Sequence, residues 1–358
     1  MKPSVLMVSA RYFPLAGGTE THVYEVSQRL VNMGYRITVC TTDPSSELAP
    51  YDRDGDVEIV RLRAYPKHSD LYFAPALGKF VRDGQWDLLH LQGYHTFVAP
   101  LALFAAKRRG IPYVVTFHSG GHSSRWRNSI RHLQIRLLRP LLTGAEQLIG
   151  VSEFEAEHFS RLLQLPREAF RVVPNGAKLP EVDPDTDLQR DPNRLLILSI
   201  GRLERYKRHQ AVISALPKVL EQEPRVYLRI VGSGRYKNEL HKLVKSLNLE
   251  SRVEIAAVPS TDRQGMAKLL LSASLVSLLS EYEAHPIAVM EALAMGRPVL
   301  VADTSGLGEL ARRGFVRSIP LDAPDGVVAE AILAGLREPF VPDKVELPTW
   351  ESCVGQLD

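Results

Sequence analysis

Short apolar runs alternate along the chain with longer segments in which apolar residues recur every three or four positions. The short runs fit strands buried on both faces of a parallel sheet, and the periodic segments fit amphipathic helices that cover it. In the first half, this pattern predicts strands at residues 5–9, 37–42, 57–62, 88–91, 113–117, 148–151 and 172–173, and helices at residues 21–33, 97–109, 130–142 and 153–163.

The pattern is interrupted halfway along the chain and then restarts. Residues 181–192 are acidic, contain proline and have no periodicity, which is typical of a linker. Further strands, each followed by a helical segment, are predicted at residues 195–200, 227–231, 253–256, 275–279 and 298–301. One continuous sheet would need about a dozen strands, which is rare. We therefore predict an α/β protein with two Rossmann-like, doubly wound parallel-sheet domains facing a central cleft.

These elements define the expected domain boundaries. The first domain covers residues 1–178 and the second covers 194–339, with a linker at 179–193 between them. A tail at 340–358 contains two prolines and then a short helical pattern, and it could pack back on the first domain.

Composition narrows the class of protein. The 358 residues are 45% hydrophobic and 24% charged, as in ordinary globular proteins, and the net charge of +3 does not require a nucleic-acid partner. Cys40 and Cys353 are the only cysteines, which excludes a disulfide framework and favours a cytoplasmic protein. The apolar runs are too short for a membrane span of about 20 residues. Because neither an HExxH motif nor a pair of CxxC motifs is present, we expect no metal and no cofactor.

The near-neutral total charge hides a basic block. Residues 88–145 contain eight lysines and arginines, five histidines and no aspartate or glutamate. Within it, residues 125–142 combine arginines and a tryptophan with apolar residues at helical spacing. Such a helix can make reversible contact with an anionic membrane surface, which would place the protein peripherally at the inner membrane face. The alternative is a buried helix with a solvated basic face.

A short predicted helix in the second half carries candidate ligand-binding groups. Pro286 suits its first turn, and Gly296 followed by a proline ends it, so the helix covers about residues 286–295. In a doubly wound sheet its N-terminus lies at the carboxyl edge of the strands, where ligands bind. There the free N–H groups of Ile287 and Ala288 would face an anion.

Two acids accompany this helix. Glu283 precedes it, and Glu291 lies inside it among apolar residues. A buried carboxylate needs a hydrogen-bond partner, and ribose hydroxyls are good candidates. The alternative for Glu291 is a solvent-facing position on an amphipathic helix.

A basic loop follows the first strand of the second half. Gly201 allows a tight turn, and Arg202 and Lys207 bring two cations to the same sheet edge. Arginine binds phosphate oxygens in bidentate fashion, so this pair suits a diphosphate. Solvated basic side chains are the alternative.

Two features of the first half are weaker candidates. Gly17 and Gly18 form a turn between the first strand and helix, without GxGxxG or P-loop spacing, and could present N–H groups to a phosphate. His118 follows the strand at 113–117 and could point into an interdomain cleft, where it would give a hydrogen bond or a proton. Structural roles are the alternative for all three residues.

Taken together, these motifs resemble the retaining glycosyltransferases of family four, which have the GT-B fold. The most specific part is Glu283 and Glu291, separated by seven residues and followed by Ala292-Leu293-Ala294-Met295-Gly296-Arg297-Pro298. Supporting pieces are the Gly-Gly loop, the strands near Asp87–His90 and 113–118, Gly150-Val151-Ser152, Val173-Pro174-Asn175-Gly176, and Gly201-Arg202 with Lys207. His285 and Pro286 depart from the aromatic residue and the glycine that are usual in the family, which leaves the sugar open.

The resemblance implies a retaining, metal-independent enzyme that moves a sugar from a nucleotide-sugar, most often a UDP-sugar, to a glycan or lipid-linked acceptor. The acceptor would bind the N-terminal domain. Carried over by position, the implied catalytic residues are His118, Arg202, Lys207 and Glu283, with Glu283 acting in binding rather than as a nucleophile. The implied donor-binding residues are Gly17, Gly18, Arg202, Lys207, Val258, Glu283, Ile287, Ala288 and Glu291.

Two other functions remain open from the residues. A nicotinamide-dependent oxidoreductase or epimerase would also use a Rossmann sheet, although the missing GxGxxG counts against it. The second alternative is a nucleotide-binding protein without catalysis. A site that had lost its activity would not need to keep all four of Arg202, Lys207, Glu283 and Glu291, which counts against this alternative.

Overall fold

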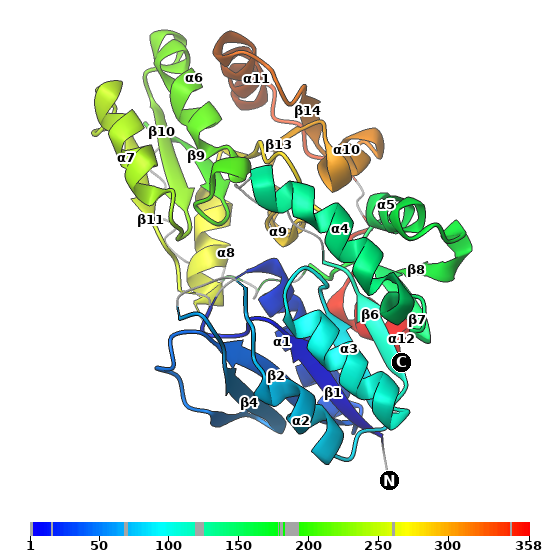
Figure 1. The fold of residues 1–358 in the computed structure, drawn as a ribbon. Coiled ribbons are helices and arrows are strands. Elements are labelled where there is room, and N and C mark those ends of the chain that lie inside the picture. Colours follow the sequence, from blue (N-terminus) through cyan, green and yellow to red (C-terminus); the bar gives the residue numbers. More distant parts are fainter. Residues whose placement is uncertain are drawn as a thin grey trace. The chain divides into compact units, whose positions relative to one another are not determined.

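The computed structural model describes residues 3–15, 17–67, 71–118, 125–177, 179, 182, 193–259, 262–343 and 346–358, with the side chains of 125–132 excepted. The chain divides into two compact units (Figure 1). The first comprises Met1–Ser119, Ser124–Asn175 and Thr349–Asp358, and the second comprises Gly120–Ser123 and Gly176–Pro348.

The first unit contains an eight-stranded sheet in the order β3-β4-β2-β1-β5-β6-β7-β8. Neighbouring strands are parallel except β3 and β4, which are antiparallel. Its strands are β1 (Ser4–Ser9), β2 (Arg36–Asp43), β3 (Tyr51–Asp54), β4 (Val57–Arg63), β5 (Leu88–Gln92), β6 (Tyr113–Thr116), β7 (Gln147–Gly150) and β8 (Phe170–Val172). All six residues of β1 are buried, as expected for a central parallel strand.

Helices cover this sheet. They are α1 (Gly18–Asn32), α2 (Ala76–Asp83), α3 (Val98–Arg109), α4 (Arg125–Leu142), α5 (Glu153–Leu163), a 3-10 turn at Arg167–Ala169, and α12 (Trp350–Leu357). Figure 1 shows α2, α3 and α4 in front of the sheet, where each packs on the next in sequence. The C-terminal helix α12 packs against α1, so the end of the chain belongs to the first unit.

The second unit contains a six-stranded, wholly parallel sheet in the order β11-β10-β9-β12-β13-β14. Its strands are β9 (Leu195–Ile200), β10 (Val226–Val231), β11 (Val253–Ala256), β12 (Leu275–Leu278), β13 (Val299–Ala302) and β14 (Arg317–Ile319). Its helices are a 3-10 turn at Arg205–Lys207, α6 (His209–Gln222), α7 (Lys237–Ser246), α8 (Arg263–Ser272), α9 (Ile287–Ala294), α10 (Ser305–Arg312) and α11 (Asp325–Arg337).

Each sheet has one point at which the strand order reverses. In the first unit it lies between β1 and β5, and in the second it lies between β9 and β12. Loops on either side of such a point leave the sheet in opposite directions, which opens a crevice at the carboxyl ends of the strands. The predicted doubly wound, parallel-sheet fold is thus present in both units.

Elements that the pattern missed include β3, α2 and β14. The edge strand β3 has four exposed residues and therefore no alternation of apolar and polar positions. The helix α2 buries only Leu77 and Val81, and β14 has three residues. Each is too short or too polar for periodicity to detect.

The linker region differs slightly from expectation. The main segment of the first unit ends at Asn175, because Ala177 and Leu179 already pack in a core cluster of the second unit. Most of the predicted acidic linker, including residues 183–192, lies outside the described part of the chain. The assignment of the two domains to acceptor and donor remains a prediction.

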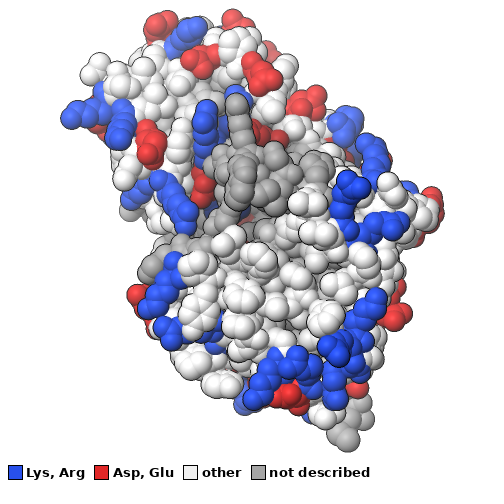
Figure 2. Space-filling model, viewed as in Figure 1, with Lys and Arg blue, Asp and Glu red and all other residues white. Residues whose placement is uncertain are grey.

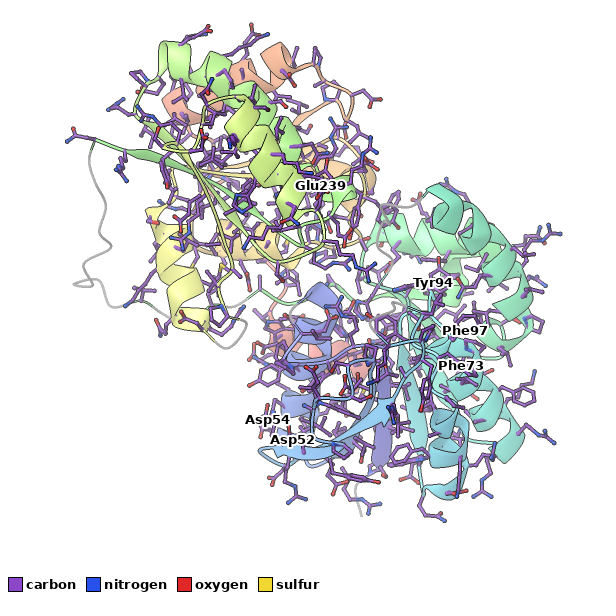
Figure 3. All side chains as sticks on the ribbon, turned by 60° about the vertical axis from the view of Figure 1, so that its left-hand side comes forward. Asp52, Asp54, Phe73, Tyr94, Phe97 and Glu239 are labelled. Atoms are coloured by element: carbon purple, nitrogen blue, oxygen red, sulfur yellow. The ribbon has the colours of Figure 1, made fainter. Side chains whose placement is uncertain are left out.

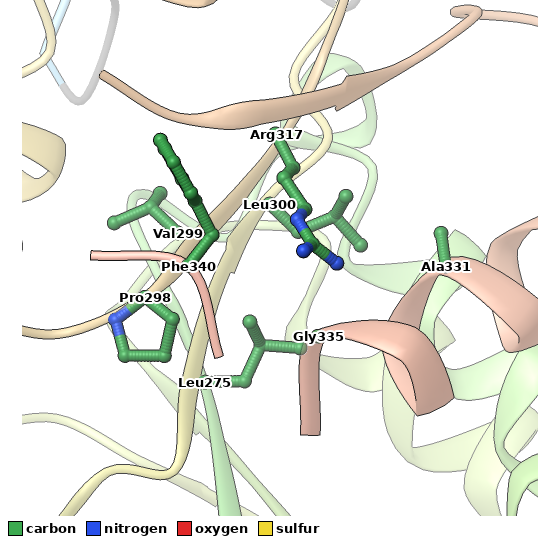
Figure 4. A pocket seen from close by; sticks show the side chains of 8 residues that line it. All are labelled: Leu275, Pro298, Val299, Leu300, Arg317, Ala331, Gly335 and Phe340. Carbon is green, nitrogen blue, oxygen red and sulfur yellow. The ribbon is translucent and has the colours of Figure 1, made fainter. Parts of the chain in front are cut away.

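The second unit encloses a small apolar cavity (Figure 4). It lies between β12, β13, β14 and α11 and has a volume of about 10 Å³, enough for one water molecule and far too small for a nucleotide. Leu275, Leu300 and Phe340 are among its lining residues. Within the described ranges, no helix has the length and hydropathy needed to cross a membrane.

Candidate active site

The loop after β9 gathers two cations around one aromatic ring. Tyr206 is buried, and its ring lies 5.9 Å from the Arg202 guanidinium carbon and 5.5 Å from Lys207 Nζ. Arg202 also donates a hydrogen bond to the Tyr206 hydroxyl. The loop begins at Gly201, whose φ of 155° is accessible to glycine at no steric cost. The structure therefore brings together the two cations predicted for this loop.

A buried histidine fixes the same loop. His209, the first residue of α6, contacts the Arg202 carbonyl through Nε2 at 3.2 Å and Ser199 Oγ through Nδ1 at 2.8 Å. Because a carbonyl can only accept, Nε2 carries the proton and Nδ1 accepts from the serine hydroxyl. Burial lowers the pKa of His209 to about 4, so the ring is neutral at physiological pH. The sequence analysis did not identify this residue.

The loop after β12 supplies the carboxylate that meets these cations. Glu283 Oε1 forms an ion pair with Lys207 Nζ and accepts a hydrogen bond of 2.8 Å from Ser280 Oγ. Glu281 N–H donates to the Tyr206 carbonyl at 2.8 Å, so the loops after β9 and β12 are tied directly. These two loops flank the reversal point of the sheet, where a ligand crevice is expected.

The N-terminus of α10 holds the backbone of Glu283. Ser305 Oγ accepts from Glu283 N–H at 2.9 Å, and Gly306 N–H donates to the Glu283 carbonyl at 2.9 Å. A Cβ at Gly306 would overlap the Ala284 carbonyl, so only glycine allows this approach. Ser305 and Gly306 lie about twenty residues beyond Glu283 and belong to no recognisable motif, so neither was predicted from the sequence.

The helix α9 begins one residue later than expected. Pro286 has an extended ψ of 107° and is the N-cap, so the helix covers Ile287–Ala294. The first backbone bonds of the helix are donated by Val289 and Met290 to the Pro286 carbonyl. The N–H groups of Ile287 and Ala288 precede them and have no acceptor within the helix.

Glu291 is buried, with 6% of its surface exposed, which excludes the solvent-facing alternative. Its carboxylate forms an ion pair of 2.6 Å with Arg263 at the start of α8. The predicted need for a partner was correct, but the sequence did not indicate Arg263. Val258, the remaining predicted donor residue of this unit, follows β11 and is partly buried against a core cluster.

In the first unit, the glycine turn leads directly into α1. Gly17 is the N-cap and Gly18 is the first helical residue. No atom lies within 4 Å of a Cβ built at Gly18, whereas one at Gly17 would meet the Glu20 carboxylate. Glu20 is buried and forms an ion pair of 3.0 Å with Arg11. The turn lies at the carboxyl end of β1, beside the reversal point of this sheet.

His118 is part of a buried polar cluster at the same sheet edge. Its Nε2 lies 2.7 Å from Gln92 Oε1, and its ring meets the edge of the His22 ring with centroids 4.5 Å apart. His22 Nδ1 lies 2.8 Å from Asn175 Oδ1. Because His22 is on α1, the cluster joins the end of β6 to the first turns of that helix.

These histidines are held neutral. Burial lowers the pKa of His22 to about 4 and that of His90 to about 3. Burial is also the main cause that lowers the pKa of His118 well below its ordinary value, with a further contribution from neighbouring histidines. A neutral His118 can give or accept a hydrogen bond but is a poor proton donor. Of its two predicted uses, this favours the hydrogen bond.

The predicted site residues therefore form two groups. Arg202, Lys207 and Glu283 meet at one sheet edge of the second unit, with α9 beginning in the loop that follows Glu283. The glycine turn and His118 belong to the first unit, where His22 on α1, the helix that the turn begins, contacts His118. Two cations and a helix N-terminus can hold a diphosphate, and the carboxylates can accept hydrogen bonds from hydroxyl groups. Within the described residues, no group of three His, Cys, Asp or Glu could hold a metal ion.

Comparison with known proteins agrees with this arrangement over most of the chain. Residues 16–179 match the family described as Glycosyltransferase Family 4, and residues 185–332 match Glycosyl transferases group 1. The chain is 26% identical to an uncharacterised glycosyltransferase of Methanocaldococcus jannaschii, covering 86% of this chain and 82% of that one. It is 24% identical to the gpi3 subunit of phosphatidylinositol N-acetylglucosaminyltransferase of Schizosaccharomyces pombe, covering 98% and 76%.

Solved structures share the fold. Sucrose-phosphate synthase from Thermosynechococcus elongatus superposes with a TM-score of 0.80 at 20% identity, covering 99% of this chain and 97% of that one. The Anabaena protein HepE in complex with UDP and glucose gives a TM-score of 0.76 at 18% identity, covering 99% and 98%. The two parallel-sheet units, the paired site residues and these matches lead to one conclusion: the chain belongs to the family 4, group 1 glycosyltransferases, sugar-transferring enzymes of the GT-B fold.

Proposed function

We propose that the chain transfers a sugar from a nucleotide-sugar, most often a UDP-sugar, to a hydroxyl group of a glycan or lipid-linked acceptor, with retention of configuration and without a metal. The observation that carries the proposal is the contact of Lys207 and Glu283 beside Arg202, at the reversal point of the second sheet. The rival oxidoreductase function has no support from the family matches.

The leaving group determines what the two cations do. When the bond between the anomeric carbon and the β-phosphate oxygen breaks, its electron pair stays on that oxygen and the diphosphate gains negative charge. Arg202 and Lys207 would stabilise this charge, and the N–H groups of Ile287 and Ala288 would add to it from the start of α9. Electrostatic stabilisation of this kind is the largest contribution in many enzymes and needs no metal ion.

Retention follows from attack on the same face. The acceptor oxygen forms a bond to the anomeric carbon from the side that the diphosphate leaves, and its proton passes to the departing phosphate oxygen. No enzyme nucleophile is needed in this route. Glu283 Oε1 is engaged by Lys207 and Ser280, which supports a role in holding the donor sugar and orienting Lys207.

The remaining groups would complete donor binding. Glu291, on α9, would accept hydrogen bonds from the ribose hydroxyls in exchange for part of its contact with Arg263. In the first unit, the turn at Gly17 and Gly18 would approach the diphosphate, and a neutral His118 would hydrogen-bond the sugar. Val258 would contact the nucleotide.

The identity of donor and acceptor is supported by relatives. The complex of HepE holds UDP and glucose, which favours a uridine nucleotide. The gpi3 relative is named for transfer of N-acetylglucosamine to phosphatidylinositol, which favours a lipid acceptor. A soluble glycan acceptor remains the alternative.

A substrate screen tests the proposal. Labelled UDP-glucose, UDP-galactose, UDP-N-acetylglucosamine, GDP-mannose and ADP-glucose are incubated with the full chain and with soluble sugars or polyprenyl-linked sugars, in the presence of EDTA. We expect one donor to give product, and we expect NMR of that product to show the anomeric configuration of the donor. Inversion, or a strict requirement for a divalent cation, would contradict the mechanism. Tight UDP binding without hydrolysis or transfer would favour a non-catalytic protein.

A further inference from the structure

The helix α3 presents an apolar stripe to solvent. Phe97, just before the helix, and Phe104, two turns later, are about half exposed, and Leu101 between them is only partly buried. The opposite side of α3 carries buried alanines and Leu103 in the core of the first unit. A helix that is apolar on its outer side as well as its inner side has a surface that is not used in folding.

Neighbouring segments widen the stripe into a patch. Leu133 and Leu137, one turn apart on the adjacent helix α4, are 58% and 71% exposed. Leu71 and Phe73 are exposed as well, and the Phe73 ring lies 6.0 Å from the Phe97 ring. Figure 3 shows Phe73 and Phe97 beside each other. Contiguous large apolar side chains of this kind mark interaction surfaces.

Cations flank the patch on both helices. Lys107, Arg108 and Arg109 end α3, and the Arg108 guanidinium lies 5.5 Å from the Phe104 ring. Arg136 and Arg139 are exposed on α4. Both helices lie inside the stretch of residues 88–145 that contains no acid. In Figure 2 this face is largely white, with blue side chains and a smaller number of red ones along its lower and right-hand edges.

We propose that this surface, the apolar–basic face of α3 and α4, binds reversibly to an anionic lipid bilayer. Aromatic and leucine side chains would enter the boundary between headgroups and acyl chains, and the cations would attract the anionic headgroups. The charges favour an anionic bilayer as the partner, because residues 88–145 contain no carboxylate that would repel anionic headgroups. The proposal goes beyond the sugar-transfer function and does not depend on the donor. If the acceptor is lipid-linked, the face also brings the enzyme to it.

The face differs from the basic helix predicted from residues 125–142 alone. Some apolar residues of that helix are buried, namely Ile135, Leu138 and Leu142. The side chains of Arg125, Trp126 and Arg127 lie outside the described residues. The exposed apolar residues instead come from α3, α4 and the segment before α2.

Vesicle sedimentation with matched variants tests the proposal. The full chain is mixed with vesicles of phosphatidylcholine alone and with vesicles containing one third phosphatidylglycerol. The charge variant is Lys107→Gln with Arg108→Gln and Arg109→Gln, and the apolar variant is Phe97→Ser with Phe104→Ser. The matched charge control is Lys237→Gln with Lys242→Gln and Lys245→Gln, which removes three exposed cations from α7. Val327→Ser, at an exposed residue of α11, is the apolar control.

We expect the wild type to bind anionic vesicles at least tenfold more tightly than neutral ones. Both α3 variants should weaken this binding at least tenfold. The charge variant removes three cations that attract anionic headgroups, and the apolar variant removes two aromatic rings that would enter the bilayer. The two controls should bind like the wild type. Equal binding to both vesicles, or equal loss in the α7 control, would overturn the proposal. So would a stable dimer in gel filtration that Phe97→Ser abolishes, because a second copy would then cover the face. Sugar transfer to a soluble acceptor is measured separately, so that a loss of vesicle binding can be distinguished from a failure of the proposed sugar-transfer function.

Discussion

Side chains of opposite charge neutralise one another in the loops at the carboxyl edge of the second sheet. Lys207 and Glu283 each expose only 13% of their side chains, and Glu291 is buried against Arg263. A largely buried charge without a partner would be strongly destabilising, and here the cations and carboxylates are paired. In the proposed function, a diphosphate would enter by replacing a carboxylate as the partner of a cation.

The Lys207→Ala variant tests the diphosphate role. We expect sugar transfer to fall at least about 100-fold, as when one preorganised charge is removed from an active site. The unpaired Glu283 carboxylate should also lower the free energy of unfolding by about 1–3 kcal/mol. Transfer is followed by nucleotide release and stability by urea unfolding.

A second variant separates these two effects. Lys207→Ala combined with Glu283→Gln should regain stability but not transfer, and Lys237→Ala on the exposed side of α7 should change neither. Near-normal turnover in Lys207→Ala would contradict the role assigned to this lysine.

Gly18→Ala tests the first unit. Since no atom lies within 4 Å of a Cβ at this helical position, alanine should leave stability unchanged or raise it by up to about 1 kcal/mol. If the turn approaches the donor diphosphate, the added methyl group should nevertheless raise the donor KM several-fold. A thermal melt and a donor titration are the two measurements. An unchanged KM would remove Gly18 from the donor site.

At this scale the sequence indicates positions but not partners. Arg202, Lys207 and Glu283 were found because they follow strands, and strand ends meet at one sheet edge. Tyr206, His209, Ser280, Ser305, Arg263 and Gln92 were missed. Ser305, Arg263 and Gln92 act through contacts with segments distant in the chain, which spacing along one segment cannot indicate. Tyr206, His209 and Ser280 bond to residues within ten positions, but they belong to no motif that spacing could reveal.

At the scale of elements, the C-terminal helix α12 depends on one large contact. Trp350 is 1% exposed, and its ring lies 6.0 Å from that of His22 on α1. Arg29 on α1 forms an ion pair of 3.0 Å with Glu351, and Tyr35 donates to Asp358. Because α12 touches the same turns of α1 that hold the His118 cluster, its packing supports that part of the site.

Trp350→Ala should therefore destabilise the first unit by about 3–5 kcal/mol, the usual cost of removing a buried tryptophan. Urea unfolding followed by circular dichroism measures it. Glu351→Ala is the matched control on the same helix. Its carboxylate is 60% exposed, so the loss should stay below about 1 kcal/mol. Equal effects of the two substitutions would show that α12 contributes little packing.

Elements with strong periodicity were predicted closely. The strands at Leu195–Ile200 and Val253–Ala256 and the helix at Glu153–Leu163 have the expected bounds. The exposed edge strand β3 was missed because its polar residues leave no pattern. The helix α3 was predicted, but its apolar outer face was not recognised, because the sequence does not tell which apolar side of a helix meets the core.

At the scale of the whole molecule, buried histidines make stability depend on pH. Burial lowers the pKa of His22 and His209 to about 4 and that of His90 to about 3, against an ordinary value of 6.5, and it also lowers the pKa of His118. At pH values between these lowered pKa values and 6.5, the unfolded chain binds protons that the folded chain does not. The free energy of unfolding is therefore greatest above pH 6.5 and falls as the pH decreases below it.

Urea unfolding at pH 7.5, 6.5, 5.8 and 5.0 tests this dependence. Each buried histidine should contribute up to about 1.4 kcal/mol per pH unit across the window. Replacement of His22 with glutamine should reduce the slope, and the exposed His241→Gln should not. A free energy of unfolding that is constant or rises from pH 6.5 to 5.0 would show that the cluster titrates normally.

Calorimetric titration of the full chain with UDP, GDP, ADP and NAD tests the central claim most directly. We expect one nucleoside diphosphate to bind with a stoichiometry of one and NAD not to bind. Lys207→Ala should weaken the binding of the diphosphate at least tenfold, or by about 1.4 kcal/mol. Binding of NAD without any nucleoside diphosphate, or a diphosphate affinity that the loss of Lys207 leaves unchanged, would contradict the central claim.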